Sequence, residues 1–119
     1  MSSLIVLEWT KLIGSSEWDE SYDISTTNDG SIYITGGTNG DLDGQSNNGS
    51  ADAFISKFNS DGEKQWTRLL GSDQYDWSYE IDIGEDGFIY ISGFTRGDLD
   101  NQTNSSTGTP GDAFISKFN

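Results

Sequence analysis

The sequence predicts an all-β protein made of two copies of one four-stranded antiparallel unit. Three observations carry this prediction: a tandem repeat along most of the chain, alternation of β-branched and aromatic residues with polar ones, and Gly-containing turns between the alternating runs. Aromatic residues make up 13% of the 119 residues and recur at regular intervals, which is typical of folded β-structure rather than of a disordered chain. We therefore expect one folded unit over residues 1–119.

The tandem repeat consists of long matching segments. Residues 9–15, which read WTKLIGS, return at residues 66–72 as WTRLLGS. The octapeptide DAFISKFN at residues 52–59 recurs unchanged at residues 112–119, with a longer spacing than the first pair of segments. The loop before the octapeptide therefore accommodates an insertion, and the repeat as a whole sets the architecture.

Each copy of the repeat contains short runs with the two-residue alternation of β-strands. The sequences Asn28-Asp29-Gly30 and Asp61-Gly62 predict tight hairpins, because Gly supplies the positive φ that such turns require. Alternation places four apolar side chains and their counterparts in the core: Ile24, Ile32, Ile34 and Phe54. The expected strands are 21–27, 31–38, 52–58 and 63–70 in the first copy, and 78–84, 88–95 and 112–118 in the second.

The second copy ends before any counterpart of the strand at 63–70, and an additional strand is expected at Leu4–Ile13. This segment repeats the Trp-Thr-Lys/Arg-Leu pattern of the strand at 63–70. We expect it to pair with a strand at 112–118 and complete that unit, as in the ring closure of β-propellers, which removes an exposed sheet edge. The predicted organisation is a closing outer strand at 4–13, a first blade at 14–70 and a second blade at 71–119 that lacks its fourth strand.

The combined pattern of each copy resembles the β-propeller repeat family abbreviated SBBP. The resemblance rests on Trp-Thr-x-x-x-Gly, then Asp-Gly-x-Ile-Tyr-Ile-x-Gly-x-Thr, Gly-Asp-Leu-Asp, and Asp-Ala-Phe-Ile-Ser-Lys-Phe-Asn-x-Asp-Gly, whose last two residues occur only in the first copy. It covers nearly all of both copies. It implies propeller blades, usually in longer bacterial chains that are often extracellular or surface-associated, and it implies no defined activity.

Two blades do not close a ring, since propellers have about four to eight. We therefore expect a homo-oligomer, with a trimer of six blades favoured and a tetramer of eight blades next. The alternative is a fragment of a longer propeller. Residues 1–7 contain a short apolar run without a basic region, so they predict neither a signal peptide nor a membrane span. An extracellular or cell-surface location is implied only by the resemblance.

The composition excludes several classes of function. The chain has 20 Asp and Glu against 6 Lys and Arg, a net charge of −14, which disfavours nucleic acids and anionic membranes as partners. With no Cys and no His, thiolate chemistry, the common zinc sites and imidazole-based catalytic triads are excluded. The pair Asp41 and Asp43 and the Ser-Lys pairs at 56–57 and 116–117 lack the context of a catalytic site, so we expect no enzymatic activity.

The long loops at 39–51 and 96–111 are expected at the same end of the sheets, where binding sites are common. Their oxygen-bearing side chains recur at alternating positions, which suits Ca²⁺. The spacing is not that of an EF-hand, and the preferred alternative is that Asp and Asn hold the loops by bonding to backbone amides. The candidate metal ligands are Asp41, Asp43, Asp52, Asp98, Asp100 and Asp112.

Aromatic residues occur in the short loops expected at the same end. Trp18 aligns with Tyr75, and Trp77 stands where the first copy has Glu20. Aromatic platforms beside Asp and Asn bind sugars in many proteins, so a lectin-like, glycan-binding function is an alternative to assembly alone. The competing interpretation is that these rings pack between blades. The candidate ligand-binding residues are Trp18, Tyr75, Trp77, Gln45, Asn47, Gln102 and Asn104.

Overall fold

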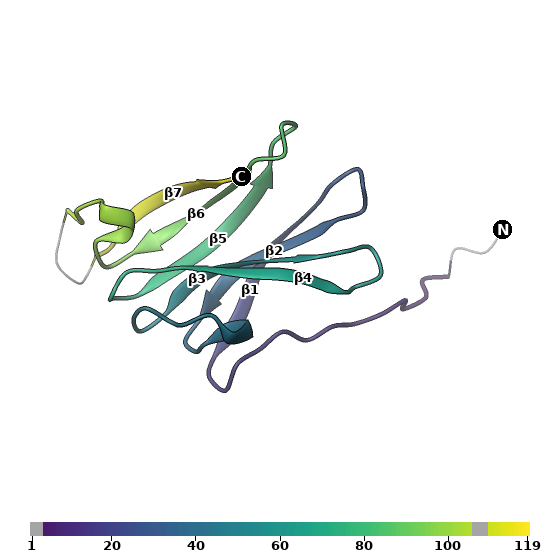
Figure 1. Ribbon diagram of the computed structural model, residues 1–119, viewed down its shortest axis with the longest axis horizontal. Helices are drawn as coiled ribbons and strands as arrows, with labels where there is room; N and C mark the ends of the chain where they lie inside the picture. Colours follow the sequence, from purple (N-terminus) through teal and green to yellow (C-terminus); the bar gives the residue numbers. More distant parts are fainter. Residues whose placement is uncertain (1–3, 106–109) are drawn as a thin grey trace.

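The computed structural model describes residues 4–105 and 110–119, and within them the chain is all-β with two antiparallel sheets (Figure 1). The first sheet has the order β1-β2-β3-β4 and the second has the order β5-β6-β7. Residues 106–109 of the second long loop lie outside the described residues. The strands are β1 (Asp19–Thr26), β2 (Ile32–Thr38), β3 (Asp52–Phe58), β4 (Lys64–Leu70), β5 (Asp76–Ile83), β6 (Ile89–Thr95) and β7 (Asp112–Phe118).

The strands lie where alternation predicted them, except that β1 and β5 begin earlier than expected. Both strands carry an irregularity in their pairing, between Ser21 and Asp23 in β1 and between Ser78 and Glu80 in β5. An extra residue at such a bulge interrupts the two-residue period, so the start of the strand is hidden from pattern analysis. Over the described ranges, no helix has the length and apolar character required to cross a membrane.

Residues 4–13, expected as a strand paired with 112–118, have no strand structure in the single chain. Figure 1 shows the reason: the N-terminal segment runs away from the sheets on one side, whereas β7 lies on the other. The segment passes the β3–β4 turn, where a Cβ added to Gly62 would lie 3.0 Å from the Trp9 ring. A strand needs a partner edge, so the predicted pairing requires a second copy of the repeat and stays a prediction.

The core lies between the two sheets. Strand β5 packs across β1, β2 and β3 of the first sheet. Tyr33 and Ile55 of the first sheet meet Ile81, Ile89 and Ile91 of the second, and all five are buried. Apolar packing of this kind is the main source of stability in a chain with few apolar residues.

Polar contacts fix how the two sheets lie against each other. The Thr35 hydroxyl donates to the Ser78 hydroxyl at 2.8 Å, and the backbone N–H of Ile81 donates to the Asp23 carboxylate at 2.9 Å. Thr35 and Ser78 are both buried, so each polar group has the partner that burial requires.

The prediction that Ile24 belongs to the core is wrong for the single chain. Ile24 is 62% exposed, whereas its repeat counterpart Ile81 is 6% exposed and Phe54 is buried. Ile32 and Ile34 are half-buried. Alternation correctly identifies the side of the strand to which Ile24 belongs. On that side of the first sheet Phe54 and Ser56 are buried, whereas Ile24, on the edge strand β1, is left largely uncovered by the described part of the chain.

Candidate functional site

An Asp side chain fixes the start of the first strand of each sheet, and it is buried at Asp76 and half-buried at Asp19. Asp76 accepts hydrogen bonds from the backbone N–H of Ser72 at 2.7 Å, from the Ser72 hydroxyl at 2.9 Å and from the Thr95 hydroxyl. The first repeat has the same bonds, made by Asp19, Ser15 and Thr38. Burial raises the pKa of Asp76, although its hydrogen bonds oppose that rise. Neither Asp residue was predicted as a site residue from the sequence, because both resemble ordinary surface charges.

The long loops are held by Asp and Asn side chains in the same way in both repeats. Asp41 accepts the backbone N–H of Asn47 at 2.9 Å, and Asp98 accepts that of Asn104 at 2.8 Å. The Asn47 amide donates to the Thr38 and Gly40 carbonyls at 3.0 and 3.1 Å. The Asn104 amide donates to the corresponding carbonyls at 3.1 Å. The side chains therefore close each loop on itself.

Asp52 and Asp112, the Asp residues at the start of the octapeptides, have different surroundings. Asp52 is fully buried and accepts the backbone N–H of Asn48 at 2.9 Å, while its Oδ1 has no hydrogen-bond partner in the described part of the chain. Burial raises the pKa of Asp52 to about 6. Asp112 is half-buried, and hydrogen bonds from the hydroxyl and backbone N–H of Ser105 lower its pKa. The same residue type therefore titrates differently in the two repeats.

The six carboxylates proposed as metal ligands are not gathered into one site. Within 4–105 and 110–119, no group of three or more acidic side chains lies close enough to hold a metal ion. Four of the six accept backbone N–H groups, and Asp43 forms an ion pair with Lys64, which lowers the pKa of Asp43. Ca²⁺ binding by Asp41, Asp43, Asp52, Asp98, Asp100 or Asp112 stays a prediction, which calorimetric titration with CaCl₂ would test.

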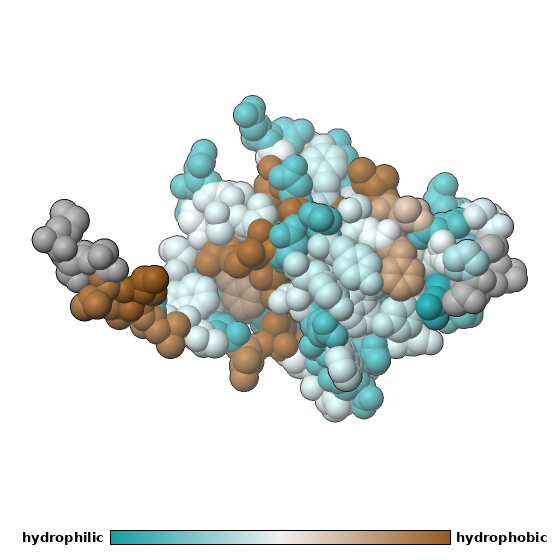
Figure 2. All heavy atoms as spheres, turned by 180° about the vertical axis from the view of Figure 1, so that it is seen from behind, coloured by the Kyte–Doolittle hydropathy of each residue, from teal (hydrophilic) through white to brown (hydrophobic). Residues whose placement is uncertain are grey.

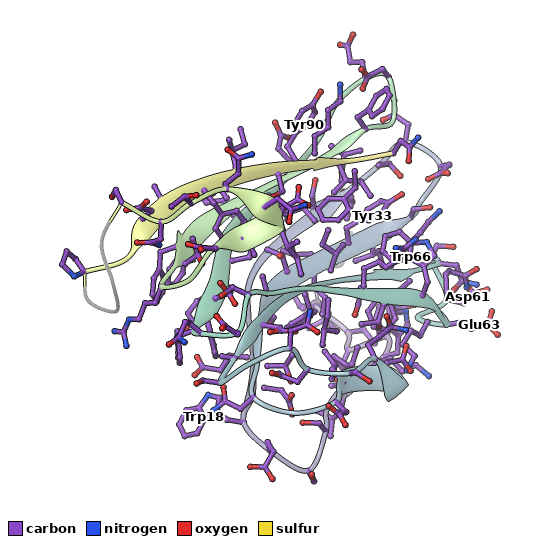
Figure 3. All side chains as sticks on the ribbon, turned by 60° about the vertical axis from the view of Figure 1, so that its left-hand side comes forward. Trp18, Tyr33, Asp61, Glu63, Trp66 and Tyr90 are labelled. Atoms are coloured by element: carbon purple, nitrogen blue, oxygen red, sulfur yellow. The ribbon has the colours of Figure 1, made fainter. Side chains whose placement is uncertain are left out.

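The three aromatic candidates lie in one groove. Trp18, Tyr75 and Trp77 line a cavity of about 500 Å³ at the end of the sheets where β1 and β5 begin. Figure 3 shows Trp18 at the opposite end of the molecule from the turn with Asp61 and Glu63. We call this cavity the aromatic groove; its other lining residues are Glu20, Tyr22, Asn39, Tyr79, Phe94 and Arg96.

Five of the six rings in the aromatic groove, all except Trp18, contact one another. Tyr75 stacks on Trp77 with ring centroids 5.5 Å apart and planes at 9°. Tyr22 meets Tyr79 edge to face at 4.9 Å, and Phe94 stacks on Tyr79 at 6.0 Å. Such pairs stabilise one another beyond the area they bury. The set thus forms one connected cluster that spans both sheets.

Two of the aromatic groove's tyrosines were not predicted as site residues from the sequence. Tyr22 and Tyr79 are repeat counterparts, and each is the extra residue at the bulge of its strand. The available signal in the sequence was that both repeats carry Tyr at this position. The amide candidates Gln45, Asn47, Gln102 and Asn104 belong to the long loops and are not among the residues that line the groove.

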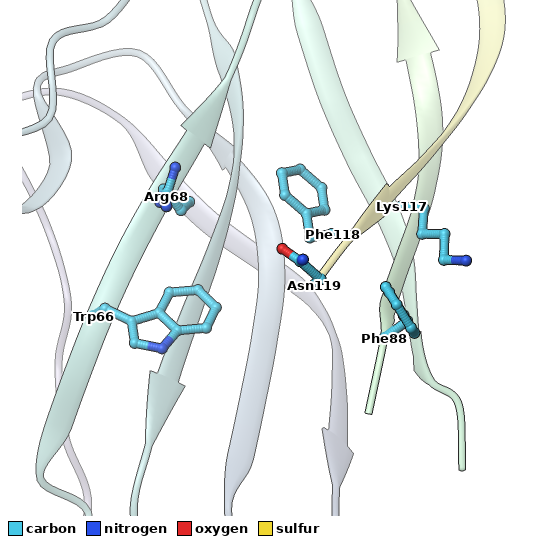
Figure 4. A pocket seen from close by; sticks show the side chains of 6 residues that line it. All are labelled: Trp66, Arg68, Phe88, Lys117, Phe118 and Asn119. Atoms are coloured by element: carbon cyan, nitrogen blue, oxygen red, sulfur yellow. The ribbon is translucent and has the colours of Figure 1, made fainter. Parts of the chain in front are cut away.

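A second concave feature runs along the outer edge of β7 (Figure 4). A cavity of about 750 Å³ lies between β4 and β7 and is lined by Trp66, Arg68, Phe88, Lys117, Phe118 and Asn119. Another, of about 350 Å³, lies between β7 and the second long loop, with Asp100, Ile115 and Ser116 in its wall. We call the two together the β7 slot. In the first sheet the corresponding position is occupied by β4, which pairs with β3.

Comparisons with known proteins provide little information about the function of this chain. No protein-family model matches it. It is 24% identical over 120 residues to regulatory protein FlaEY of Caulobacter vibrioides. That similarity covers 94% of this chain but 13% of the length of FlaEY.

Proposed function

We propose that the chain is a non-enzymatic interaction module that assembles with further copies of itself into a ring of four-stranded sheets, a β-propeller. The main support is that equivalent residues are buried in one repeat and exposed in the other. Ile55 is 1% exposed and its counterpart Ile115 is 77% exposed; Ile81 is 6% exposed and its counterpart Ile24 is 62%. Because the repeats are so similar in sequence, the difference reflects which sheet faces have a neighbour.

The interface between the two sheets uses opposite faces of the repeat. The first sheet contributes the face with Tyr33 and Trp66, and the second contributes the face with Ile81. In Figure 3, Tyr33 and Trp66 lie between the sheets, while Tyr90, the counterpart of Tyr33, lies outside the second sheet. The two outer faces are thus the two halves of the same interface, and they fit a head-to-tail contact with a second copy.

Such a contact would bury apolar side chains that are exposed in the single chain. Covering Ile24 and Ile115 contributes roughly 1.5–3 kcal/mol for each side chain, set against the entropy lost on association. A head-to-tail contact repeats at every junction, so it either closes a ring or extends a filament. A closed ring leaves no exposed face.

The β7 slot supports the same assembly at the level of strands. In the first sheet, β4 lies beside β3 with Trp66 opposite Lys57 and Thr67 opposite Ser56. The hydroxyls of Ser56 and Thr67 lie 2.8 Å apart and are hydrogen-bonded. By repeat equivalence, residues 4–13 of another copy would lie beside β7 and place their Thr opposite Ser116.

The segment proposed to fill the slot is apolar and exposed in the single chain. Val6 is 68% exposed, Leu7 is 80% and Leu12 is 96%. Figure 2 shows the start of this segment as a brown arm that projects from the body of the protein. Since the arm and β7 of one chain lie on different sides (Figure 1), the strand beside β7 would come from a neighbour.

Ring size follows from the number of blades. Propellers close with about four to eight blades, so chains with two blades form rings of four, six or eight. A four-blade ring needs steep angles between blades that carry bulky Trp and Phe residues. We therefore favour a trimer of six blades, with a tetramer of eight blades next.

A second possibility is that more copies of the repeat follow or precede these two in one longer chain, which would cover the same faces. The match to FlaEY favours a longer chain, because the matched region is only 13% of the length of FlaEY. In this case the isolated chain of 119 residues would stay a single copy in solution.

The proposal is tested by placing a charge on an outer face. We expect Ile115→Glu to sediment as single chains, because a carboxylate in the interface has no partner, while circular dichroism still reports β-structure. The matched control is Asn28→Glu, a charge added at an exposed turn, which should keep the mass of the unmodified assembly. An Ile115→Glu variant with the unmodified mass would contradict the proposal.

A further inference from the structure

We propose that the aromatic groove binds a neutral oligosaccharide, with sugar rings stacked on its exposed aromatic faces. The groove lies within one chain, between the first strands of the two sheets, so this inference goes beyond the proposed assembly and does not depend on it. Its volume of about 500 Å³ suits a small part of a polysaccharide rather than a protein surface.

The floor and rim of the groove differ in exposure. Trp77 is 3% exposed and stacks with Tyr75, so these rings form a fixed floor. Trp18 is 64% exposed, and its Nε1–H donates to the Glu20 carboxylate, which holds the indole in place. A rigid, exposed aromatic face loses little conformational entropy when a ligand stacks on it.

Packing between the sheets does not account for the exposed rings. A Cβ added to Gly37 would lie 2.2 Å from the Trp77 ring, so Trp77 is a packing residue. Trp18 is 64% exposed, and although Tyr22 and Tyr79 contact each other across the two sheets, they remain 46% and 44% exposed. Three large aromatic side chains around one hollow are the type of surface patch that marks a binding site.

The charges around the groove favour a neutral ligand. The net charge of −14 opposes an anion. A cation would compete with Arg96, whose guanidinium lies 5.3 Å from the centre of the Tyr75 ring and 5.9 Å from that of Phe94. The contact between Tyr22 and Tyr79 also leaves no gap between these rings for a quaternary ammonium group.

The polar groups of the groove match the hydroxyls of a sugar. Glu20 offers a carboxylate acceptor, Arg96 offers guanidinium donors, and the Asn39 side chain offers both kinds. Donors and acceptors beside an aromatic platform bind the hydroxyl edge of a sugar while its apolar face stacks. Assembly of several chains would repeat the groove and raise the avidity for a polysaccharide.

The test uses the unmodified chain and soluble probes. We expect a neutral hexasaccharide from a panel that includes cellohexaose and mannohexaose to quench tryptophan fluorescence and release heat in calorimetric titration. Trp18→Ala should weaken this binding about tenfold through loss of the stacking face. Trp18→Tyr, which installs the residue of the second repeat, should keep most of it. Asn28→Ala, at the opposite end of β1, should leave it unchanged.

Three results would overturn the inference: no neutral hexasaccharide binds at millimolar concentration, Trp18→Ala binds as tightly as the unmodified chain, or a heparin hexasaccharide binds more tightly than any neutral one. The solution mass of each variant separates this outcome from a failure of assembly. A single-chain mass with sugar binding intact would contradict the assembly and support the groove.

Discussion

Asp76 shows how one buried side chain organises the end of a sheet that carries the aromatic groove. It joins the loop at Ser72 to the end of β6 at Thr95, and Arg96 of the groove follows directly. The same arrangement around Asp19 places Trp18 beside the start of β1. These carboxylates are therefore expected to matter for both stability and the shape of the groove.

Replacing Asp76 by Ala should lower the free energy of unfolding by roughly 2–4 kcal/mol, because the Ser72 and Thr95 donors would lose their acceptor inside the protein. Denaturant unfolding followed by circular dichroism measures this difference. The matched control is Asp73→Ala, an exposed neighbour of the same charge, expected to stay within about 0.5 kcal/mol of the unmodified chain. Equal effects of the two substitutions would contradict the role assigned to Asp76.

The pKa of Asp52 predicts a pH dependence of stability. Burial, with smaller contributions from the charges of Asp76 and Asp41, raises it to about 6 from the ordinary value of 3.8. Between these values the folded chain holds a proton that the unfolded chain releases, so stability falls as pH rises from about 4 through 6. The raised pKa of Asp76 acts in the same direction.

We therefore expect a higher melting temperature at pH 5 than at pH 7.5, and a smaller difference in Asp52→Asn. Asp29 is the control, because hydrogen bonds from Thr27 and Ser31 lower its pKa to about 2. The stabilisation that ionised Asp29 provides is present above about pH 4 and is lost as pH falls towards 2. Asp29→Asn should therefore leave the change in melting temperature between pH 5 and 7.5 as it is in the unmodified chain. If Asp52→Asn has the same difference in melting temperature between pH 5 and 7.5 as the unmodified chain, Asp52 is excluded as the source of that difference.

At the scale of elements, the strand proposed to enter the β7 slot has a defined register. We expect Thr10→Cys combined with Ser116→Cys to form disulfides between chains on oxidation, since their counterparts Thr67 and Ser56 are directly opposed. The chain has no Cys of its own, so non-reducing electrophoresis reports only the engineered bonds.

The control for register is Thr10→Cys combined with Ile115→Cys. Neighbouring residues of a strand point to opposite faces, so this pair should cross-link poorly. Cross-linking of both pairs to the same extent, or of neither, would contradict the proposed pairing of residues 4–13 with β7.

Most of the strand positions could be predicted from the sequence, because a side chain's place in a strand depends on local alternation. The starts of β1 and β5 could not, since each bulge shifts the alternation by one residue. The burial of Ile24 could not be predicted either: alternation identifies its face of the sheet, whereas its exposure depends on what packs on that face, which the local pattern does not encode.

The site was predictable to a similar degree. The alignment of Trp18 with Tyr75, and the place of Trp77, pointed to residues that the structure brings into one groove. The metal ligands predicted in the acidic loops do not lie together in one site. Asp and Asn serve equally as metal ligands and as hydrogen-bonding partners of backbone groups, and composition does not distinguish these roles. Asp19 and Asp76 were missed because nothing in the local sequence indicates that Asp19 is half-buried and Asp76 fully buried.

At the scale of the whole molecule, we propose that two sheets in one chain leave both halves of a repeated interface open. The most direct measurement is the mass of the unmodified chain in solution, by light scattering after size-exclusion chromatography over a range of micromolar concentrations. The proposed ring predicts three times the mass of one chain, or four times for the larger ring, independent of concentration. The mass of a single chain throughout that range would contradict it.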